Sequence, residues 1–269
     1  MTFWLNGRLL EDGTAAIDPG DRGFTLGDGL FETIRASGGS ACHLDRHFAR
    51  LRRGAAVLDL PVPWADEAIA EAIAEVLAAN RLTDAAIRVT LSRGPGARGV
   101  PPPAQPTPTL LITAAAAAPA GPAVAIIATV TRRNQASPLS QIKSLNYLDN
   151  ILARLEAARL GANEALLLNT VGRVVESSAA NLFVVLDGVL TTPPIEDGPL
   201  PGIMRGLLIE RCGAVERSLT PDLLFAAESA FLSSSLGLRP LVMVNGRRIG
   251  GLGAGAAVVA GLGPVVLAP

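Results

Sequence analysis

The sequence contains a single lysine, Lys143, and the other 22 of its 23 basic residues are arginines. Arginine can replace lysine wherever only a positive charge is needed. Its guanidinium stays protonated, however, so it cannot act as an amine nucleophile toward a carbonyl group. The one remaining lysine is therefore a candidate for covalent chemistry. The alternative is that Lys143 is a chance surface residue, and composition alone does not decide between the two.

Cysteine is also scarce, since only Cys42 and Cys212 occur in 269 residues. They are far apart in the sequence and form no metal-like cluster. Two cysteines in a chain of this length are typical of a reducing compartment and not of a disulfide framework. The N-terminal residues lack a basic segment followed by an apolar one, so we expect no signal peptide and a cytoplasmic protein.

An excess of charge is likewise missing, because the formal net charge is −1 and the basic residues are scattered. This argues against nucleic acid or an anionic membrane as the main partner. One uncharged stretch, residues 107–131, is long enough to suggest a membrane span. It contains several proline and glycine residues, however, and these favour two buried strands around a linker.

The sequence is rich in apolar residues (49%), enough for a large core in one or two domains. Asn6-Gly7, Asp187-Gly188 and Asn245-Gly246 predict type I′ hairpin turns, because both central residues of such a turn need positive φ. Hydrophobic spacing and helix-start signals predict helices over 43–58, 65–80 and 144–160 and from residue 202. Strands are predicted over 87–91, 109–113 and 124–130 and in a meander over 165–190.

The alanine- and proline-rich run 114–122 predicts a domain boundary. We therefore expect a smaller N-terminal α/β domain over residues 1–115, a linker over 116–122 and a larger C-terminal domain over 123–269. The pattern indicates a mixed α/β fold with antiparallel hairpins, not a series of βαβ units.

Two positions suggest chemistry. Lys143 lies just before a predicted helix, where a rigid scaffold can hold a reactive amine. Glu176 lies in a strand region otherwise rich in Val, Leu and Phe, where a half-buried carboxylate needs a cationic or protonated partner. The alternative for Glu176 is a surface position on an edge strand. His43 and His47 are one helical turn apart, but no third ligand is nearby and no metal site is predicted.

Seven segments of the chain resemble fold-type IV enzymes dependent on pyridoxal phosphate, the class IV aminotransferase family. They occur in the family's order, at residues 21–35, 43–51, 92–99, 143–157, 163–183, 201–205 and 231–241. The group includes branched-chain aminotransferases, D-amino-acid aminotransferases and 4-amino-4-deoxychorismate lyases. The resemblance implies a two-domain α/β fold, a cofactor bound mainly by the larger domain, a small amino substrate and a homodimer.

The resemblance also implies roles for single residues. Lys143 would form the Schiff base with the cofactor and then move the proton at the substrate's amine-bearing carbon. Glu176 would pair with the pyridine nitrogen, and Arg50 would anchor the phosphate through its planar fork. Further cofactor contacts are implied for Tyr147, whose spacing from the lysine differs by one residue from branched-chain enzymes, and for Ile203, Met204 and Ser235.

The substrate side is implied by Phe31, Arg98 and Ser234. Arg98 would bind the substrate carboxylate, and the alternative is a solvated loop arginine. D-amino-acid aminotransferases usually use a Tyr, an Arg and a His here, whereas this chain has Phe31, Arg98 and Val100. Asp28 and Glu32 are expected to organise the loop and the subunit interface.

These differences, with the turn SSSLGLRPL and the loop SRGPGARG, favour a lyase that eliminates pyruvate from aminodeoxychorismate and leaves 4-aminobenzoate for folate synthesis. Some lyases have an arginine at the position of Tyr147, which is a departure. The alternative is a class IV aminotransferase that acts on D-amino acids, or on branched-chain L-amino acids, with a 2-oxo acid acceptor. A cofactor-binding protein without turnover is disfavoured, because cofactor storage does not require both Lys143 and Glu176.

Overall fold

The computed structural model describes residues 1–14, 16–118 and 121–266. The chain divides into two compact units. The first comprises Met1–Ala118 with Ile142–Asn146, and the second comprises the described residues of Pro119–Gln141 and Tyr147–Ala268. The predicted division assigned residues 142–146 to the C-terminal domain, whereas they pack with the first unit. Residues 119 and 120 of the predicted linker, and 267–269 of the predicted second domain, lie outside the described residues.

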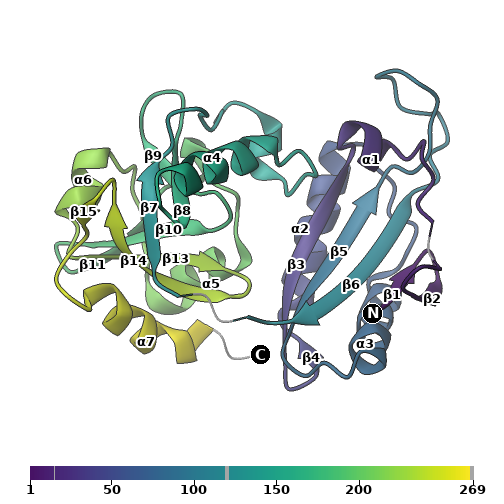
Figure 1. The fold of residues 1–269 in the computed structure, drawn as a ribbon, viewed down its shortest axis with the longest axis horizontal. Helices are drawn as coiled ribbons and strands as arrows, with labels where there is room; N and C mark the ends of the chain where they lie inside the picture. Colours follow the sequence, from purple (N-terminus) through teal and green to yellow (C-terminus); the bar gives the residue numbers. More distant parts are fainter. Residues whose placement is uncertain (15, 119–120, 267–269) are drawn as a thin grey trace. The chain divides into compact units, whose positions relative to one another are not determined.

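The first unit is built on an antiparallel sheet of six strands in the order β2-β1-β6-β5-β3-β4 (Figure 1). The strands are β1 (Thr2–Leu5), β2 (Arg8–Glu11), β3 (Gly29–Ser37), β4 (Ser40–Ala41), β5 (Ala85–Ser92) and β6 (Thr109–Ala116). Its helices are α1 (Arg22–Leu26), α2 (Leu44–Val57) and α3 (Asp66–Ala79). The predicted helices and the two predicted strands of this unit are confirmed, and both strands extend further than expected.

Helices α2 and α3 cover one face of this sheet (Figure 1). Because side chains alternate along a strand, Leu30 and Ile34 of β3 and Ile87 of β5 enter the core beneath the helices. Phe31 and Arg88 lie on the opposite face by the same alternation. The sheet therefore presents one apolar face to the helices and one mixed face on which chemistry can take place.

The second unit contains nine strands in the order β12-β11-β10-β13-β14-β7-β8-β9, with β15 added beside β14 (Figure 1). They are β7 (Ala123–Ile127), β8 (Glu164–Leu168), β9 (Val174–Ser177), β10 (Asn181–Leu186), β11 (Val189–Thr192), β12 (Val215–Glu216), β13 (Ser229–Ser234), β14 (Gly237–Val244) and β15 (Arg247–Arg248). Strand β9 also pairs with β10 through Glu176 and Asn181, so the path of strands returns on itself.

The helices of the second unit are α4 (Leu148–Arg159), α5 (Ile203–Cys212), α6 (Pro221–Ala226) and α7 (Ala254–Val266), with short 3₁₀ turns at Pro138–Gln141 and Ile195–Asp197. Helix α5 begins just after Gly202, as predicted. The buried core joins α5 to β10 and β13, with Met204 and Leu207 packed near the stacked rings of Phe183 and Phe231. This packing fixes the N-terminus of α5 relative to the sheet.

All three predicted hairpin turns are confirmed. Asn6, Asp187 and Asn245 have φ of 48°, 51° and 48°, and the glycine after each also has positive φ. The turns join β1 to β2, β10 to β11 and β14 to β15. Asparagine, aspartate and glycine tolerate this left-handed conformation, so local chemistry alone determines these turns.

Two predicted boundaries are wrong. The helix expected over 144–160 begins only at Leu148, because residues 143–145 are extended and hydrogen-bond to β3. The strand expected over 124–130 ends at Ile127, since the Thr129 and Val130 amides donate to the Glu156 carboxylate instead of continuing the strand. In both places, contacts distant in sequence override the local pattern.

The uncharged stretch 107–131 contains strands β6 and β7, as expected. Among the described residues, no helix is both long enough and apolar enough to cross a membrane.

Candidate active site

Lys143 lies on an extended segment that runs beside the first residues of β3. Its carbonyl accepts from the Phe31 amide at 2.9 Å, and the Leu145 amide donates to the Gly29 carbonyl at 2.9 Å. Ser144 forms a bridge with Leu30 between them. These bonds hold the lysine backbone against a buried strand, which satisfies the expectation of a rigid scaffold for the amine.

The Lys143 side chain contacts the ring of Phe31. Its Nζ lies 4.3 Å from the ring centroid, and Cζ of Arg88 lies 3.3 Å from the same centroid. Both distances are within the range of cation–π interactions. The structure thus brings together Lys143 and Phe31, which were predicted, and Arg88, which was not. The signal for Arg88 was a lone charge in the apolar strand IRVTL.

Arg50 belongs to a buried cluster with Glu32 and His47. Its Nε and Nη2 donate to the two oxygens of Glu32 at 2.8 and 2.6 Å, and His47 Nδ1 lies 2.7 Å from Glu32 Oε2. Burial by itself would raise the pKa of Glu32, but hydrogen bonds from Arg50 and His47 outweigh it and lower this pKa to about 2. Burial lowers the pKa of His47, and the charges of Arg50 and Lys143 lower it further against the opposing effect of Glu32.

Glu32 therefore holds helix α2 through intramolecular bonds, and its role at a loop and a subunit interface stays a prediction. The assignment of Arg50 as the phosphate anchor stays a prediction. The bidentate bond to Glu32 orients its guanidinium, as an anchor requires.

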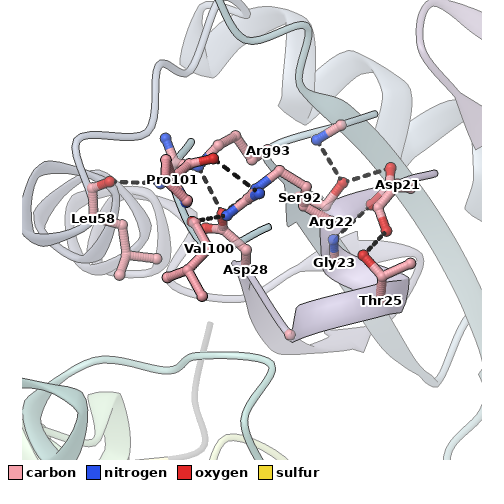
Figure 2. Close-up of polar contacts among 12 residues, drawn as sticks. Asp21, Arg22, Gly23, Thr25, Asp28, Leu58, Ser92, Arg93, Val100 and Pro101 are labelled. Atoms are coloured by element: carbon pink, nitrogen blue, oxygen red, sulfur yellow. Dashed lines mark hydrogen bonds and ion pairs between the residues drawn. The ribbon is translucent and has the colours of Figure 1, made fainter. Parts of the chain in front are cut away.

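Asp28 does organise a loop, as expected. Its Oδ2 accepts from Nε of both Arg22 and Arg93 at 2.8 Å (Figure 2). Arg22 in turn binds the loop that follows Arg98. The side chain of Arg98 is exposed on this loop, and Val100 is exposed beside it. The assignment of Arg98 to a substrate carboxylate stays a prediction.

Glu176 is buried in the second unit, with 5% of the residue exposed, so the alternative of a surface glutamate is wrong. Its Oε2 accepts from Asn181 Nδ2 at 3.2 Å and from the Leu200 amide at 3.1 Å. Its Oε1 lies 3.3 Å from Nη2 of Arg133. The cationic partner that the sequence required is therefore Arg133, which sequence reasoning did not identify.

Arg133 is itself fixed by backbone carbonyls. Its Nε donates to Gly198 at 3.0 Å and its Nη2 to Ser140 at 2.8 Å. Three groups from separate segments thus hold the Glu176 carboxylate in one orientation. A carboxylate held in this way can accept a hydrogen bond from a ring N–H and stabilise its positive charge.

The N-terminus of α5 is arranged to bind an anion. Its N-cap is Gly202, and no side chain caps the helix among the described residues. A Cβ at residue 202 would overlap Oδ1 of Asn181, so a larger residue would displace the side chain that donates to Glu176. The amides of Ile203 and Met204 open the helix, where the unpaired N–H groups and the helix dipole favour negative charge.

Three serines end the neighbouring strand β13 and start its turn to β14. The hydroxyl of Ser233 is buried and has no hydrogen-bond partner among the described residues. Ser234 and Ser235, the two that were predicted, are half-buried, and Ser234 Oγ accepts from the Leu236 amide at 3.3 Å. Tyr147 occupies the N-cap position of α4 and belongs to the second unit, whereas Lys143 belongs to the first.

Each unit contains groups that fit a part of pyridoxal phosphate. In the first unit, the Lys143 amine matches its aldehyde carbon. In the second unit, the buried Glu176 carboxylate paired with Arg133 matches its ring nitrogen, and the uncapped glycine start of α5 with the unbonded Ser233 hydroxyl matches its phosphate.

Comparison with known proteins gives the same result over most of the chain. The family model for class IV aminotransferases matches residues 29–244. A candidate branched-chain-amino-acid aminotransferase of Methanocaldococcus jannaschii is 34% identical over 258 residues, covering 93% of this chain and 90% of that protein. The D-alanine aminotransferase of Bacillus licheniformis is 29% identical over 257 residues, with coverage of 93% and 90%.

Solved structures agree with these matches. A candidate 4-amino-4-deoxychorismate lyase of Legionella pneumophila has a TM-score of 0.82 and 33% identity, covering 88% of this chain and 90% of that chain. A T.th. branched-chain aminotransferase, complexed with N-(5′-phosphopyridoxyl)-L-glutamate, has a TM-score of 0.85 and 30% identity, with coverage of 93% and 87%. The chain therefore belongs to the class IV aminotransferase family and is an enzyme that depends on pyridoxal phosphate.

Proposed function

We propose that this enzyme transfers the amino group of an amino acid to a 2-oxo acid. The observation that carries the proposal is the Lys143 amine, fixed to β3 and accompanied on Phe31 by the Arg88 guanidinium. An amine next to a second cation suits a substrate whose reacting carbon bears a carboxylate. The two named relatives that match over 93% of the chain are aminotransferases, and this supports the same reaction.

The protein side of the reaction follows from its residues. The cofactor, when bound, supplies a ring that accepts the electron pair left at the substrate carbon. The Lys143 amine removes the proton from that carbon and delivers it to the former aldehyde carbon of the cofactor. Glu176, held by Arg133 and Asn181, keeps the ring nitrogen protonated. Arg50, the Ile203 and Met204 amides and the Ser235 hydroxyl hold the phosphate, and Tyr147 contacts the ring.

The substrate is held by its carboxylate in this proposal. Arg98 binds the carboxylate, and Phe31 and Ser234 line the pocket around the substrate. Phe31 contributes an apolar surface whose ring position is set by Lys143 and Arg88. Small or branched apolar amino acids, of D or L configuration, are the substrate class that this arrangement favours.

A second candidate reaction is the elimination of pyruvate from aminodeoxychorismate. It is supported by the structural likeness to the candidate lyase of Legionella pneumophila at 33% identity. It is also supported by Phe31 and Val100, which replace the tyrosine and histidine expected of a D-amino-acid enzyme. Both reactions need the same roles of Lys143 and Glu176, so only the products distinguish them.

The covalent role of Lys143 is tested by Lys143→Arg. Since this is the only lysine, borohydride reduction of the native enzyme should attach the cofactor to one tryptic peptide, identifiable by mass. The variant keeps the charge but loses the nucleophilic amine, so it should lack the visible absorption band and lose at least about a thousandfold of turnover. Normal turnover in the variant would contradict the proposal.

The reaction type is tested by a single turnover with D-alanine, L-leucine and aminodeoxychorismate in separate mixtures. Conversion of the bound cofactor to its pyridoxamine form by an amino acid would establish amino transfer. Pyruvate and 4-aminobenzoate without that conversion would establish elimination. Neither outcome with any of the three would refute both candidate reactions.

The enzyme is proposed to act as a homodimer. The exposed ring of Phe24 lies beside an apolar cavity of about 510 Å³ on the first unit, lined also by Ile17, Leu111 and Leu145. Exposed apolar surface of this kind marks interaction sites. Light scattering coupled to size exclusion should give twice the 27.7 kDa chain mass, and a monomer at micromolar concentration would exclude this.

A further inference from the structure

The buried side chain of Arg22 forms hydrogen bonds with residues 99–101, in the middle of the loop between β5 and β6 (residues 93–108). Arg22 donates from Nη1 to the carbonyls of Gly99 at 3.0 Å and Pro101 at 3.3 Å, and from Nη2 to that of Val100 at 2.8 Å. Figure 2 shows the Arg22 guanidinium directed at this stretch of backbone. Three consecutive carbonyls thus share one guanidinium, which only the planar fork of arginine allows.

Arg22 is held in turn by Asp28. The same Asp28 oxygen accepts from Nε of Arg22 and from Nε of Arg93, both at 2.8 Å. Arg93 reaches the end of α2 and donates to the carbonyls of Leu58 at 2.6 Å and Asp59 at 3.0 Å (Figure 2). One carboxylate oxygen therefore connects the loop tip to the helix that carries the predicted phosphate anchor.

Asp28 keeps its charge across the physiological range. Burial opposes ionisation of this group, but hydrogen bonds from Arg93 and Arg22 outweigh it and lower its pKa below the ordinary value. The connection is therefore permanent and does not act as a pH switch.

The base of the loop is fixed separately. Asp21 accepts from the hydroxyls of Ser92 and Thr109, both at 2.8 Å, where the loop leaves β5 and enters β6. Gly94 has φ of +80°, and a Cβ there would overlap the carbonyl of Thr107. Between this base and the gripped carbonyls, the exposed side chain of Arg98 directly precedes Gly99.

We propose that Arg22 is a positioning residue that holds the 99–101 backbone so that Arg98 is ready to bind the substrate carboxylate. This inference rests on the proposed function of Arg98. An exposed arginine on a loose loop would lose much conformational entropy on binding, whereas a loop held in advance removes most of that loss. Arg22 itself is buried and does not touch the substrate.

The first test measures loop mobility and does not depend on any substrate. Trypsin cleaves after arginine, and Arg98 is the exposed arginine of the loop. In Arg22→Gln, cleavage between residues 98 and 99 should accelerate at least about tenfold, and Arg22→Lys should lie between this variant and the native enzyme. Arg52→Gln is the matched control, because Arg52 also grips a carboxylate and a carbonyl, those of Asp66 and Trp64.

The second test measures the consequence for catalysis, using the holoenzyme with the amino acid that is turned over. Arg22→Gln should raise KM about tenfold and change kcat less than about threefold, while the cofactor absorption band stays unchanged. Combined with Arg98→Gln, the two substitutions should be strongly non-additive, because Arg98 contributes little once the loop is loose.

Three outcomes would overturn the inference. Cleavage after Arg98 at the native rate in both Arg22 variants would show that Arg22 does not hold the loop. Equal acceleration in Arg52→Gln would show a general loss of stability. Additive effects of the Arg22 and Arg98 substitutions on KM would show that the two act independently. Absence of the cofactor absorption band from the native enzyme would instead refute the proposed function. Failure of this inference and failure of the proposed function are therefore distinguishable.

Discussion

The first unit contains two clusters in which one carboxylate is shared by two basic side chains, and they are used differently. In the Glu32 cluster, the carboxylate takes both Nε and Nη2 of Arg50 and one nitrogen of His47. In the Asp28 cluster, Arg22 and Arg93 each donate to the carboxylate only from Nε, and their other guanidinium nitrogens donate to backbone carbonyls.

The difference shows how the position of a carboxylate decides what it stabilises. Glu32 lies beneath α2 with 1% of its surface exposed, so its partners must neutralise it locally. Asp28 directly precedes β3, and the two arginines bound to it also donate to the backbone carbonyls of two loops. The first cluster fixes a side chain on a helix, and the second fixes main chain that has no regular structure.

The largest effect should come from Glu32→Gln. Loss of the carboxylate leaves the buried Arg50 guanidinium without its countercharge, which typically costs about 3–5 kcal/mol of unfolding free energy. Urea denaturation of the purified enzyme measures this change. Glu71→Gln, at an exposed position of α3, should change stability by less than about 0.5 kcal/mol. Similar values for both variants would show that the Glu32 carboxylate does not stabilise the fold through Arg50.

The next largest effect should be on acid stability. The pKa of Glu32 is about 2 in the folded state and 4.5 ordinarily, so the unfolded chain takes up this proton first as pH falls. Its contribution, on the order of 3 kcal/mol, is complete above pH 4.5 and is lost between pH 4.5 and 2.

His47 acts in the same direction at higher pH. Its pKa is lowered by burial, so its contribution is complete above pH 6.5 and decreases as pH falls below that value. Urea unfolding at a series of pH values should show both declines, and the lower one should be absent in Glu32→Gln. An unchanged pH profile in that variant would contradict the assigned role of Glu32.

A smaller effect on overall stability is expected for Asp28→Asn, about 2 kcal/mol, because Arg22 and Arg93 keep their carbonyl partners and asparagine keeps one acceptor. The effect on the loop should be larger, with faster tryptic cleavage after Arg98. In Glu32→Gln, cleavage there should follow global unfolding only. If cleavage after Arg98 is as slow in Asp28→Asn as in the native enzyme, Asp28 does not help Arg22 to hold the loop.

Local sequence was sufficient for much of the fold. The three hairpin turns follow from Asn-Gly and Asp-Gly pairs, and α2, α3 and α5 follow from apolar spacing and a glycine start. The predictions failed where groups distant in sequence form hydrogen bonds with the backbone. Strand β3 does so with residues 143–145, and Glu156 does so at the end of β7.

The candidate site was only partly predictable. Lys143 and Glu176 stood out as unusual residues in their surroundings, and Phe31 followed from the family resemblance. Arg133 and Asn181 did not, because their roles depend on partners in other segments. Arg88 was marked only as a lone charge in an apolar strand, and its contact with Phe31 appears only in the structure. Arg22 was similarly hidden, since the carbonyls that it binds are 77 to 79 positions away along the chain.

The sequence by itself determined the turns, most helices, the position of the candidate lysine and the family to which the chain is similar. These depend on short-range backbone preferences and on residue chemistry that needs no partner. Only the tertiary structure decided which cation neutralises Glu176, which carboxylate orients Arg50 and which side chain holds the loop of Arg98. Such choices depend on which charged groups are buried together, and burial is a property of the folded chain as a whole.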